Sequence, residues 1–138
     1  MGNTDGCTTY YEHETGNNQI KAGTATAITA NIQSGDFDLG PGQQGLAGDG
    51  ELMMKIRRVL PDFLTQTGTT RITLNLKNYP TDSEASSSLG PFDITSSTDK
   101  IDTRARARAI ALKISNTGLA QHWKVGTFRL DIQPDGRR

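Results

Sequence analysis

The chain contains 138 residues with 15 basic and 15 acidic side chains, and 33% of its residues are hydrophobic. This length predicts a single domain over residues 1–138, since domains usually hold roughly 100–150 residues, with residues 1–7 as a flexible N-terminal segment. The balanced charge provides no long-range attraction for nucleic acid or anionic lipid, so we expect neither sequence-specific nucleic-acid binding nor membrane binding. A single cysteine, Cys7, excludes an intrachain disulfide and a multi-cysteine metal site.

Short segments that alternate apolar and polar residues lie between clusters of Thr, Ser, Gly and Asn. A period of two is typical of half-buried strands. We therefore predict an all-β fold, an antiparallel β-sandwich of about seven strands. In chain order the predicted strands are Thr8–Thr15, Thr26–Leu39, Glu51–Leu60, Thr70–Asn78, Pro91–Thr95, Asp102–Ser115 and Trp123–Gln133.

In two of these segments the apolar positions change parity at a glycine. The apolar residues are even-numbered up to Ile32 and odd-numbered from Phe37, and Gly35 lies between them. The same change occurs around Gly126 in the last predicted strand. A β-bulge at each glycine would keep one face of the strand in the core.

The segment Glu51–Leu60 also fits one face of a helix that would continue to Leu64. Pro61 does not decide between the two, because proline would end a helix or a strand at that point. We favour a strand, since no other segment has a helical period. The segments Gly40–Gly50 and Pro80–Gly90 are predicted to be exposed loops.

Alternating arginines are the most informative feature of the sequence. In a regular strand Arg104, Arg106 and Arg108 would point to the same side as the apolar residues that follow them, from Ile110 to Ile114. Each unpaired buried charge costs several kcal/mol, so a core face cannot hold these guanidinium groups. The strand must therefore leave its core near Arg108, or bulge there.

The arginines also suggest an interface. A row of guanidinium groups suits bidentate pairing with carboxylates of another subunit, and the candidate interface residues are Arg57, Arg58, Arg104, Arg106 and Arg108. Arg57 and Arg58 are adjacent, so we expect one on each face of its strand. The alternative is a solvated basic row balanced by Asp93, Asp99 and Asp102. Nucleic-acid contact is less favoured, because no aromatic residues for base stacking are interleaved.

Motifs for catalysis, cofactors or metals are weak in this sequence. Asp36 and Asp38 have the spacing of paired acids on one strand face, but the residues of a calcium loop do not follow them. The cluster Glu12–Glu14 places His13 opposite both glutamates in a strand, and two histidines cannot build a three-histidine zinc site. No nucleophile elbow or phosphate-binding motif occurs. We predict no enzyme activity, no catalytic residues, no cofactor and no metal.

Several segments resemble one known family in the same order along the chain. They are residues 11–14, 34–40, 56–63 and 98–106, Trp123–Gly126, and the ending Asp131–Arg138, which contains Gln-Pro-Asp-Gly-Arg-Arg. Together they resemble the C-terminal region of tail nozzle, or tail tubular, proteins of short-tailed bacteriophages. Those proteins are several times longer, so the resemblance implies a module of a longer protein or a small relative.

The resemblance implies a structural virion protein located in the phage tail and assembled in the cytoplasm of the host bacterium. It implies a homo-oligomeric ring around the DNA exit channel, with other tail proteins such as an adaptor and a fibre as partners. Three alternatives stay open. The first is a carbohydrate- or receptor-binding β-sandwich of a phage tail, for which Tyr10 and Tyr11 are the only adjacent aromatic residues. The second is a small tail-associated hydrolase that would use Asp36 and Asp38, and the third is a self-assembling structural module.

Overall fold

The fold is all-β, as the sequence predicts. The computed structural model describes residues 16–40, 51–79, 81–82 and 87–136, and this part of the chain contains twelve strands and no helix, hence none long enough to cross a membrane. Every strand pairing is antiparallel. The predicted strand Thr8–Thr15 lies outside the described residues.

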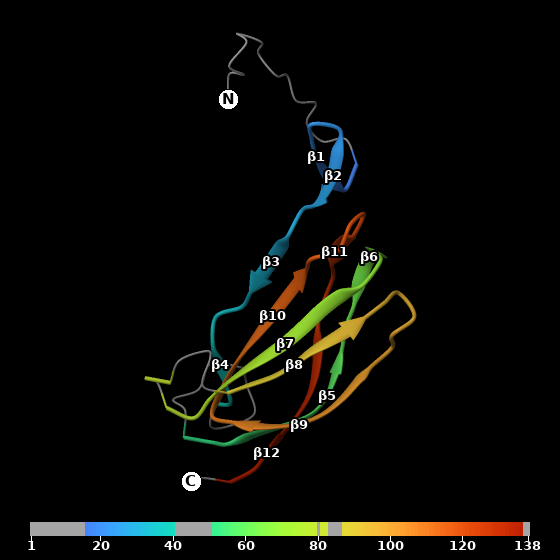
Figure 1. Cartoon of the computed structure of the whole chain (residues 1–138). Helices are drawn as coiled ribbons and strands as arrows, with labels where there is room; N and C mark the ends of the chain where they lie inside the picture. Colours follow the sequence, from blue (N-terminus) through green and yellow to red (C-terminus); the bar gives the residue numbers. More distant parts are fainter. Residues whose placement is uncertain (1–15, 41–50, 80, 83–86, 137–138) are drawn as a thin grey trace.

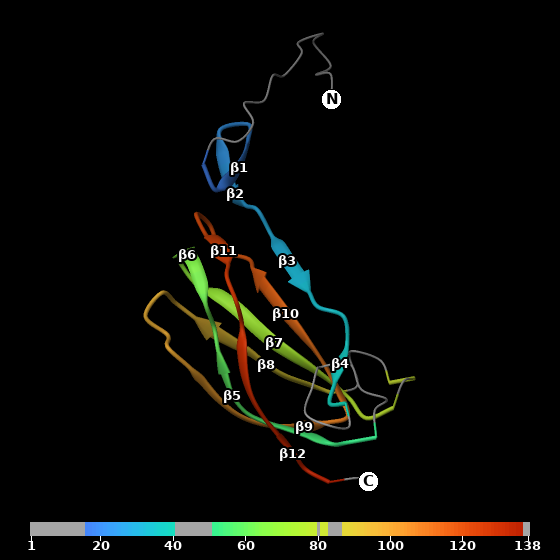
Figure 2. The same ribbon diagram turned by 180° about the vertical axis from the view of Figure 1, so that it is seen from behind.

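Two layers form a sandwich (Figures 1 and 2). In the first sheet the order is β3 (Ala30–Gln33), β10 (Ala109–Asn116), β7 (Thr70–Lys77) and β8 (Ser88–Ile94), and β4 (Phe37–Asp38) also pairs with β10. In the second sheet the order is β12 (Arg129–Pro134), β5 (Met54–Leu60) and β9 (Ile101–Ala107). The pair β11 (His122–Val125) and β6 (Phe63–Thr67) extends the second layer, because the chain runs directly from β5 into β6 and from β11 into β12.

Alternating side chains from both sheets build the core. On β7, Ile72 and Leu74 are fully buried, and their cross-strand partners on β10 are apolar as well. From the second sheet, β5 contributes Met54, Ile56 and Val59, each fully buried. Other members of the core are Ile94, Ile101, Ala105, Ala107, Ile110 and Ile114. The period of two in the sequence thus decides which side chains the two sheets bury.

The chain changes sheets at Arg108. The strand β9 ends at Ala107 in the second sheet, and β10 begins at Ala109 in the first. On β9 the odd-numbered residues are buried and Arg104 and Arg106 are exposed, whereas on β10 the buried set includes Ile110. The predicted break near Arg108 is confirmed, since a single regular strand would have placed the arginines in the core.

Both predicted bulges are present as one extra residue. Between the pairs Gln33–Lys113 and Phe37–Ile110, the chain advances four residues on the side of Gly35 and three on β10. The second bulge lies around Gly126. Val125 pairs with Phe63 and Arg129 pairs with Leu60, so the chain advances four residues on the side of Gly126 and three residues on the partner side. The backbone N–H of Gly126 donates to the carbonyl oxygen of Asp62 at 2.8 Å.

The segment Thr26–Leu39 differs from the prediction, because it is not one strand with one buried face. The chain passes through the end of β2, β3 and β4, and Ile28 and Ile32 are 48% and 53% exposed. Ile32 pairs with the buried Ile114, so both residues point to the core side of the sheet. However, β3 is an edge strand, and the facing sheet covers it less than it covers β10.

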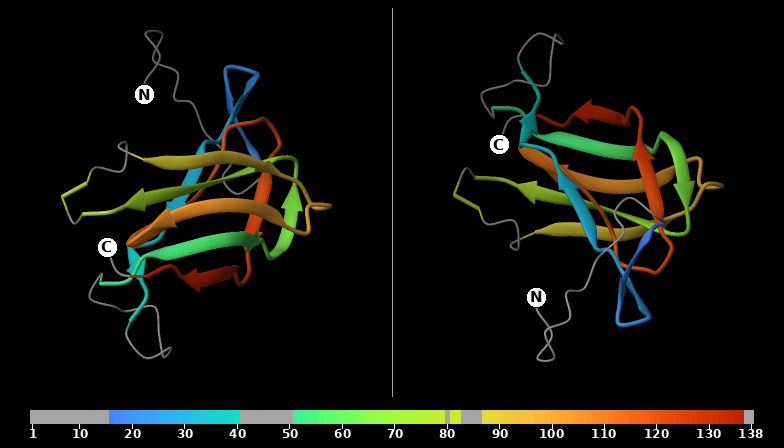
Figure 3. Two further views of the ribbon diagram at one scale, coloured as in Figure 1. Left: turned by 90° about the horizontal axis from the view of Figure 1, so that it is seen from below. Right: turned by 90° about the horizontal axis from the view of Figure 1, so that it is seen from above.

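Two elements were not predicted from the sequence. The strand β6 continues after Pro61, where we expected the strand to end, since proline occupies only the connection between β5 and β6. A hairpin of β1 (Asn18–Lys21) and β2 (Thr24–Ala27) turns at Ala22 and Gly23, which have φ values of 50° and 77°. This hairpin projects away from the sandwich (Figure 3).

Replacing Leu74 with Ala should lower the free energy of unfolding by ~2–5 kcal/mol, because the substitution opens a cavity at a fully buried position. The matched control is Leu64→Ala, at a position that is 65% exposed, where we expect a change of about 0.5 kcal/mol or less. Urea denaturation measures both. Similar losses for the two variants would contradict this assignment of the core.

Replacing Gly126 with Ala should lower the free energy of unfolding by ~1–3 kcal/mol, because the added Cβ would lie 2.9 Å from the backbone oxygen of Asp62. Gly35→Ala tests the other bulge, where a Cβ would meet no atom within 4 Å. There we expect a change between zero and a gain of ~1 kcal/mol. Thermal or urea unfolding distinguishes the two variants, and an equal effect would show that the bulges do not differ in packing.

Candidate functional site: a cationic sheet face

The outer face of the β12–β5–β9 sheet carries most of the arginines that the sequence singles out. We call Lys55, Arg57, Arg58, Arg104 and Arg106 the cationic face. A surface hollow of ≈ 500 Å³ lies on it, and its lining residues are Lys55, Arg57, Arg58, Asp102, Thr103, Arg104 and Asp131. These five basic residues come from β5 and β9, which are neighbouring strands of one sheet.

An irregularity in β5 places Arg57 and Arg58 together. The pairing with β9 shifts register between Ile56 and Arg58, and both Ile56 and Val59 are fully buried. Arg57 and Arg58 therefore both lie outside the core, between the buried Ile56 and Val59, and both line the hollow. The prediction of one arginine on each face of the strand is wrong, because the inward position would have buried a guanidinium group in the apolar core.

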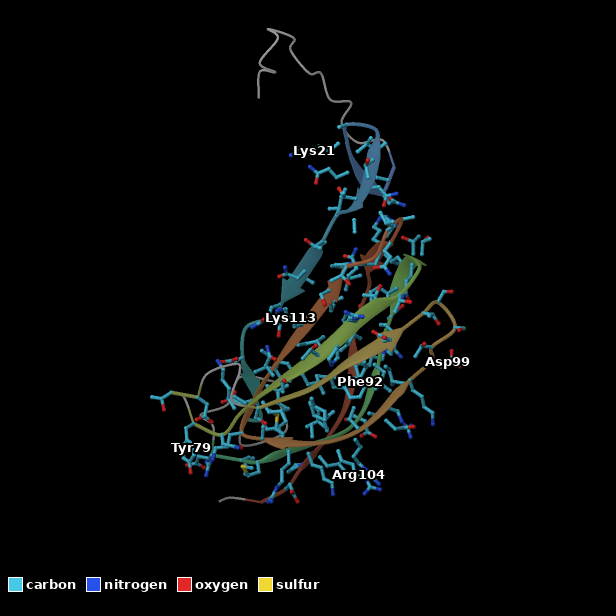
Figure 4. The ribbon with its side chains drawn as sticks, viewed as in Figure 1. Lys21, Tyr79, Phe92, Asp99, Arg104 and Lys113 are labelled. Carbon is cyan, nitrogen blue, oxygen red and sulfur yellow. The ribbon has the colours of Figure 1, made fainter. Side chains whose placement is uncertain are left out.

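Regular alternation orients the arginines of β9. Ala105 and Ala107 are 2% and 0% exposed, and they face the core with Ile101 and Thr103. Arg104 and Arg106 are exposed on the opposite side, and the side chain of Arg104 extends outward from the lower edge of the molecule in Figure 4. Alanine suits the inner positions because its small side chain lets the facing sheet approach closely.

Three ion pairs lie on or beside the cationic face. The Nε of Arg58 is 2.9 Å from Oδ1 of Asp102, and Nζ of Lys100 is 3.4 Å from the other oxygen of the same carboxylate. The Nε of Arg106 is 2.6 Å from Oδ2 of Asp135. These pairs hold Arg58 and Arg106 in place, although exposed ion pairs contribute little to the stability of a fold.

Asp102 is the carboxylate most affected by this arrangement. The hydrogen bond from Arg58 lowers the pKa of Asp102 below its ordinary value of 3.8, Lys100 adds to the effect, and partial desolvation opposes it. Hydrogen bonding and positive charge both favour the ionised form. Asp102 therefore stays ionised to lower pH than an isolated aspartate.

Three other basic residues belong to the cationic face. Within the described part of the chain, no carboxylate forms an ion pair with Lys55, Arg57 or Arg104. Asp93, which the sequence offered as a balancing charge, instead pairs with Arg71 at 2.9 Å. The alternative of a basic row whose charge is balanced by aspartates therefore holds only in part. Asp102 pairs with Arg58, but the described residues leave an excess of positive charge on this face.

Arg108 does not belong to the cationic face. It is half-buried at the point where the chain changes sheets, and its backbone N–H donates to the carbonyl oxygen of Lys77 at 3.1 Å. Of the five candidate interface residues, the structure thus brings together four and separates the fifth.

The weaker candidates that the structure describes do not belong to the cationic face. Asp36 accepts a bond from Nζ of Lys77 at 2.7 Å, so it acts in an ion pair. No group of three or more possible metal ligands occurs among the described residues. Trp123 packs against the core and its indole N–H donates to Oδ1 of Asn116, and His122 is exposed. Cys7, the tyrosines at 10 and 11, and the cluster Glu12–Glu14 lie outside the described residues.

Sequence reasoning missed three members of this site. Lys55 is two residues before Arg57 on the same strand, so the period of two could have predicted that Lys55 lies on the same face as Arg57. Asp131 and Asp135 contained no such signal, because they reach the site only through the pairing of β12 with β5. Strand neighbours do not follow from alternation within one strand.

No protein-family model, curated protein or solved structure matches this chain. The chemistry of the cationic face and the resemblance of the sequence segments are therefore the grounds for a functional proposal.

Replacing Arg58 with Gln should raise the pKa of Asp102 toward 3.8, because the substitution removes the strongest cause of its lowered pKa. A carbon-detected NMR titration of the Asp102 carboxyl group measures the change. The matched control is Arg71→Gln, which breaks an equally short pair with Asp93 on the other sheet and should leave Asp102 unchanged.

The sign of the stability effect follows from the lowered pKa. Since Asp102 binds protons less tightly when folded, the pair stabilises the fold above the unfolded pKa, and this effect is lost as the pH falls through the folded pKa. The difference in stability between the wild type and Arg58→Gln should therefore shrink on acidification. A difference that grows on acidification would contradict the assignment.

Proposed function

We propose that this chain is a non-enzymatic structural module of the tail of a short-tailed bacteriophage, in the tail nozzle around the DNA exit channel. It acts by assembling into a homo-oligomeric ring and by contacting other tail proteins. The observation that carries this proposal is the exposed cationic face, where Lys55, Arg57 and Arg104 have no ion-pair partner among the described residues.

Arginine geometry supports an interface with protein. A guanidinium group offers a planar fork of donors that matches a carboxylate, so arginine is favoured at protein interfaces. On the cationic face, neighbouring ion pairs hold Arg58 and Arg106, which reduces the conformational entropy lost when a partner binds. A rigid sheet with oriented arginines suits permanent assembly.

The resemblance gives the proposal its location. Three of the segments that resemble tail nozzle proteins contribute to the cationic face or its ion pairs: residues 56–63, residues 98–106 and the ending Asp131–Arg138. The similarity in sequence and the candidate interface thus coincide on one sheet. A receptor-binding sandwich would instead require an exposed aromatic platform, and Tyr79 is the only aromatic residue among the exposed large apolar side chains of the described part.

Light scattering over a range of concentration and salt should show an assembly of defined mass that dissociates as salt rises, since exposed charges are screened at high ionic strength. Electron microscopy of that species should show a ring with a central opening. Particles that remain monomeric at all concentrations, or that assemble into open fibres, would contradict the proposed ring.

Arg104→Glu should shift the assembly toward monomer by about tenfold or more in dissociation constant, because it places a like charge where a carboxylate is expected. The matched control is Lys113→Glu, on the other sheet, which should leave the mass distribution unchanged. Circular dichroism and urea unfolding should show that both variants fold. If the Arg104→Glu variant were unfolded, Arg104 would be required for the stability of the fold, which would contradict its assignment to an interface.

A further inference from the structure

Charge is balanced over the whole chain but separated along it. The first 20 residues contain Asp5, Glu12 and Glu14 and no lysine or arginine, and the first basic residue is Lys21. The cationic face has the opposite excess, because Lys55, Arg57 and Arg104 are not paired with any described carboxylate. The chain therefore contains both halves of a complementary electrostatic contact.

The hairpin that follows the acidic segment and the cationic face lie at opposite ends of the molecule (Figure 4). The acidic segment is joined to the β1–β2 hairpin, and Lys21 of this hairpin lies at one end in Figure 4, whereas Arg104 lies at the other end. Two complementary surfaces at separate places on one subunit form a head-to-tail contact, and head-to-tail contacts produce closed rings when the rotation between subunits allows.

The hairpin end also carries exposed apolar side chains. Of the six large apolar side chains that are exposed in the described part, Ile20, Ile28 and Leu119 belong to the hairpin, the segment after it and the adjoining turn before β11. Asn18 Oδ1 accepts a bond from the backbone N–H of Ala120 at 2.5 Å, which ties the hairpin to this turn. A gathering of exposed apolar groups indicates a surface that a partner covers.

We propose that the acidic N-terminal segment, residues 1–15, of one copy binds the cationic face of a second copy. Its carboxylates pair with Arg57, Arg104 and Lys55, and the apolar hairpin end is brought against the neighbour. This inference rests on the proposed function, since it names the contact that builds the ring. A cis contact within one chain and the binding of an anionic polymer are the competing occupants of the cationic face.

A peptide test addresses the contact without requiring a ring. The receptor is the full chain with Asp5→Asn, Glu12→Gln and Glu14→Gln, and the probe is a fluorescent peptide of residues 1–17. We expect binding by anisotropy at low salt, and a loss of affinity of about tenfold or more when the peptide carries the same three amides. Adding Arg104→Glu to the receptor should weaken binding similarly, whereas Lys113→Glu should not.

A mixing test distinguishes a second copy from the same chain. One variant has the three amides and an intact cationic face, and the other has an intact N-terminal segment with Arg57→Glu and Arg104→Glu. Each alone should be monomeric, and their mixture should form 1:1 heterodimers in native mass spectrometry, because only one productive contact is left. The wild type decides between a contact in trans and one in cis. Under a cis contact the wild type stays monomeric at every concentration and does not bind the peptide that the triple-amide receptor binds, and this result overturns the proposal.

The outcomes separate this inference from the proposed function. If the wild type forms rings and the triple-amide variant forms them equally well, the N-terminal contact is wrong and the ring stands. If the peptide binds and the wild type forms open chains or dimers, the contact stands and the ring is wrong, whereas a wild type that is only monomeric indicates a cis contact. If the triple-amide protein retains a DNA oligonucleotide on the cationic face and binds no peptide, the occupant is an anionic polymer and the inference is overturned.

Discussion

Guanidinium groups cannot enter an apolar core without partners, and this constraint shapes the second half of the chain. The arginines at 104 and 106 precede a run of apolar residues of the same parity. One continuous strand would therefore either bury the guanidinium groups together with the apolar side chains or leave both exposed. The chain resolves the conflict at Arg108, where β9 of one sheet ends and β10 of the other begins. Because β10 pairs with β3, β4 and β7, most of the first sheet depends on this change.

The same constraint explains why the outer face of the second sheet is basic. Small alanines on the inner side of β9 let the two sheets approach, and the arginines between them are necessarily outside. Irregular pairing at Arg57 has the same result on β5, since it excludes two successive arginines from the core. The cationic face is therefore a direct consequence of how the sheet buries its apolar residues.

The proposed function depends on the orientation and the charge of the cationic face. Ion pairs with Asp102 and Asp135 orient part of the cationic face. Under the proposed contact, the basic residues beside them, which pair with no carboxylate of the described chain, bind the acidic start of a second copy. A contact of this kind is specific in direction and sensitive to salt. Both properties suit the proposed role of a tail module that joins copies of itself in one orientation.

Sequence alone determined the all-β class, the faces of the regular strands, the bulges at Gly35 and Gly126 and the break at Arg108, because each depends on alternation within a single strand. Only the tertiary structure decided that Arg106 pairs with Asp135, that Arg58 pairs with Asp102, and that Ile32 on the core side of an edge strand is left exposed. Those features depend on which strands are neighbours and in which register, and hydrophobic alternation does not encode either.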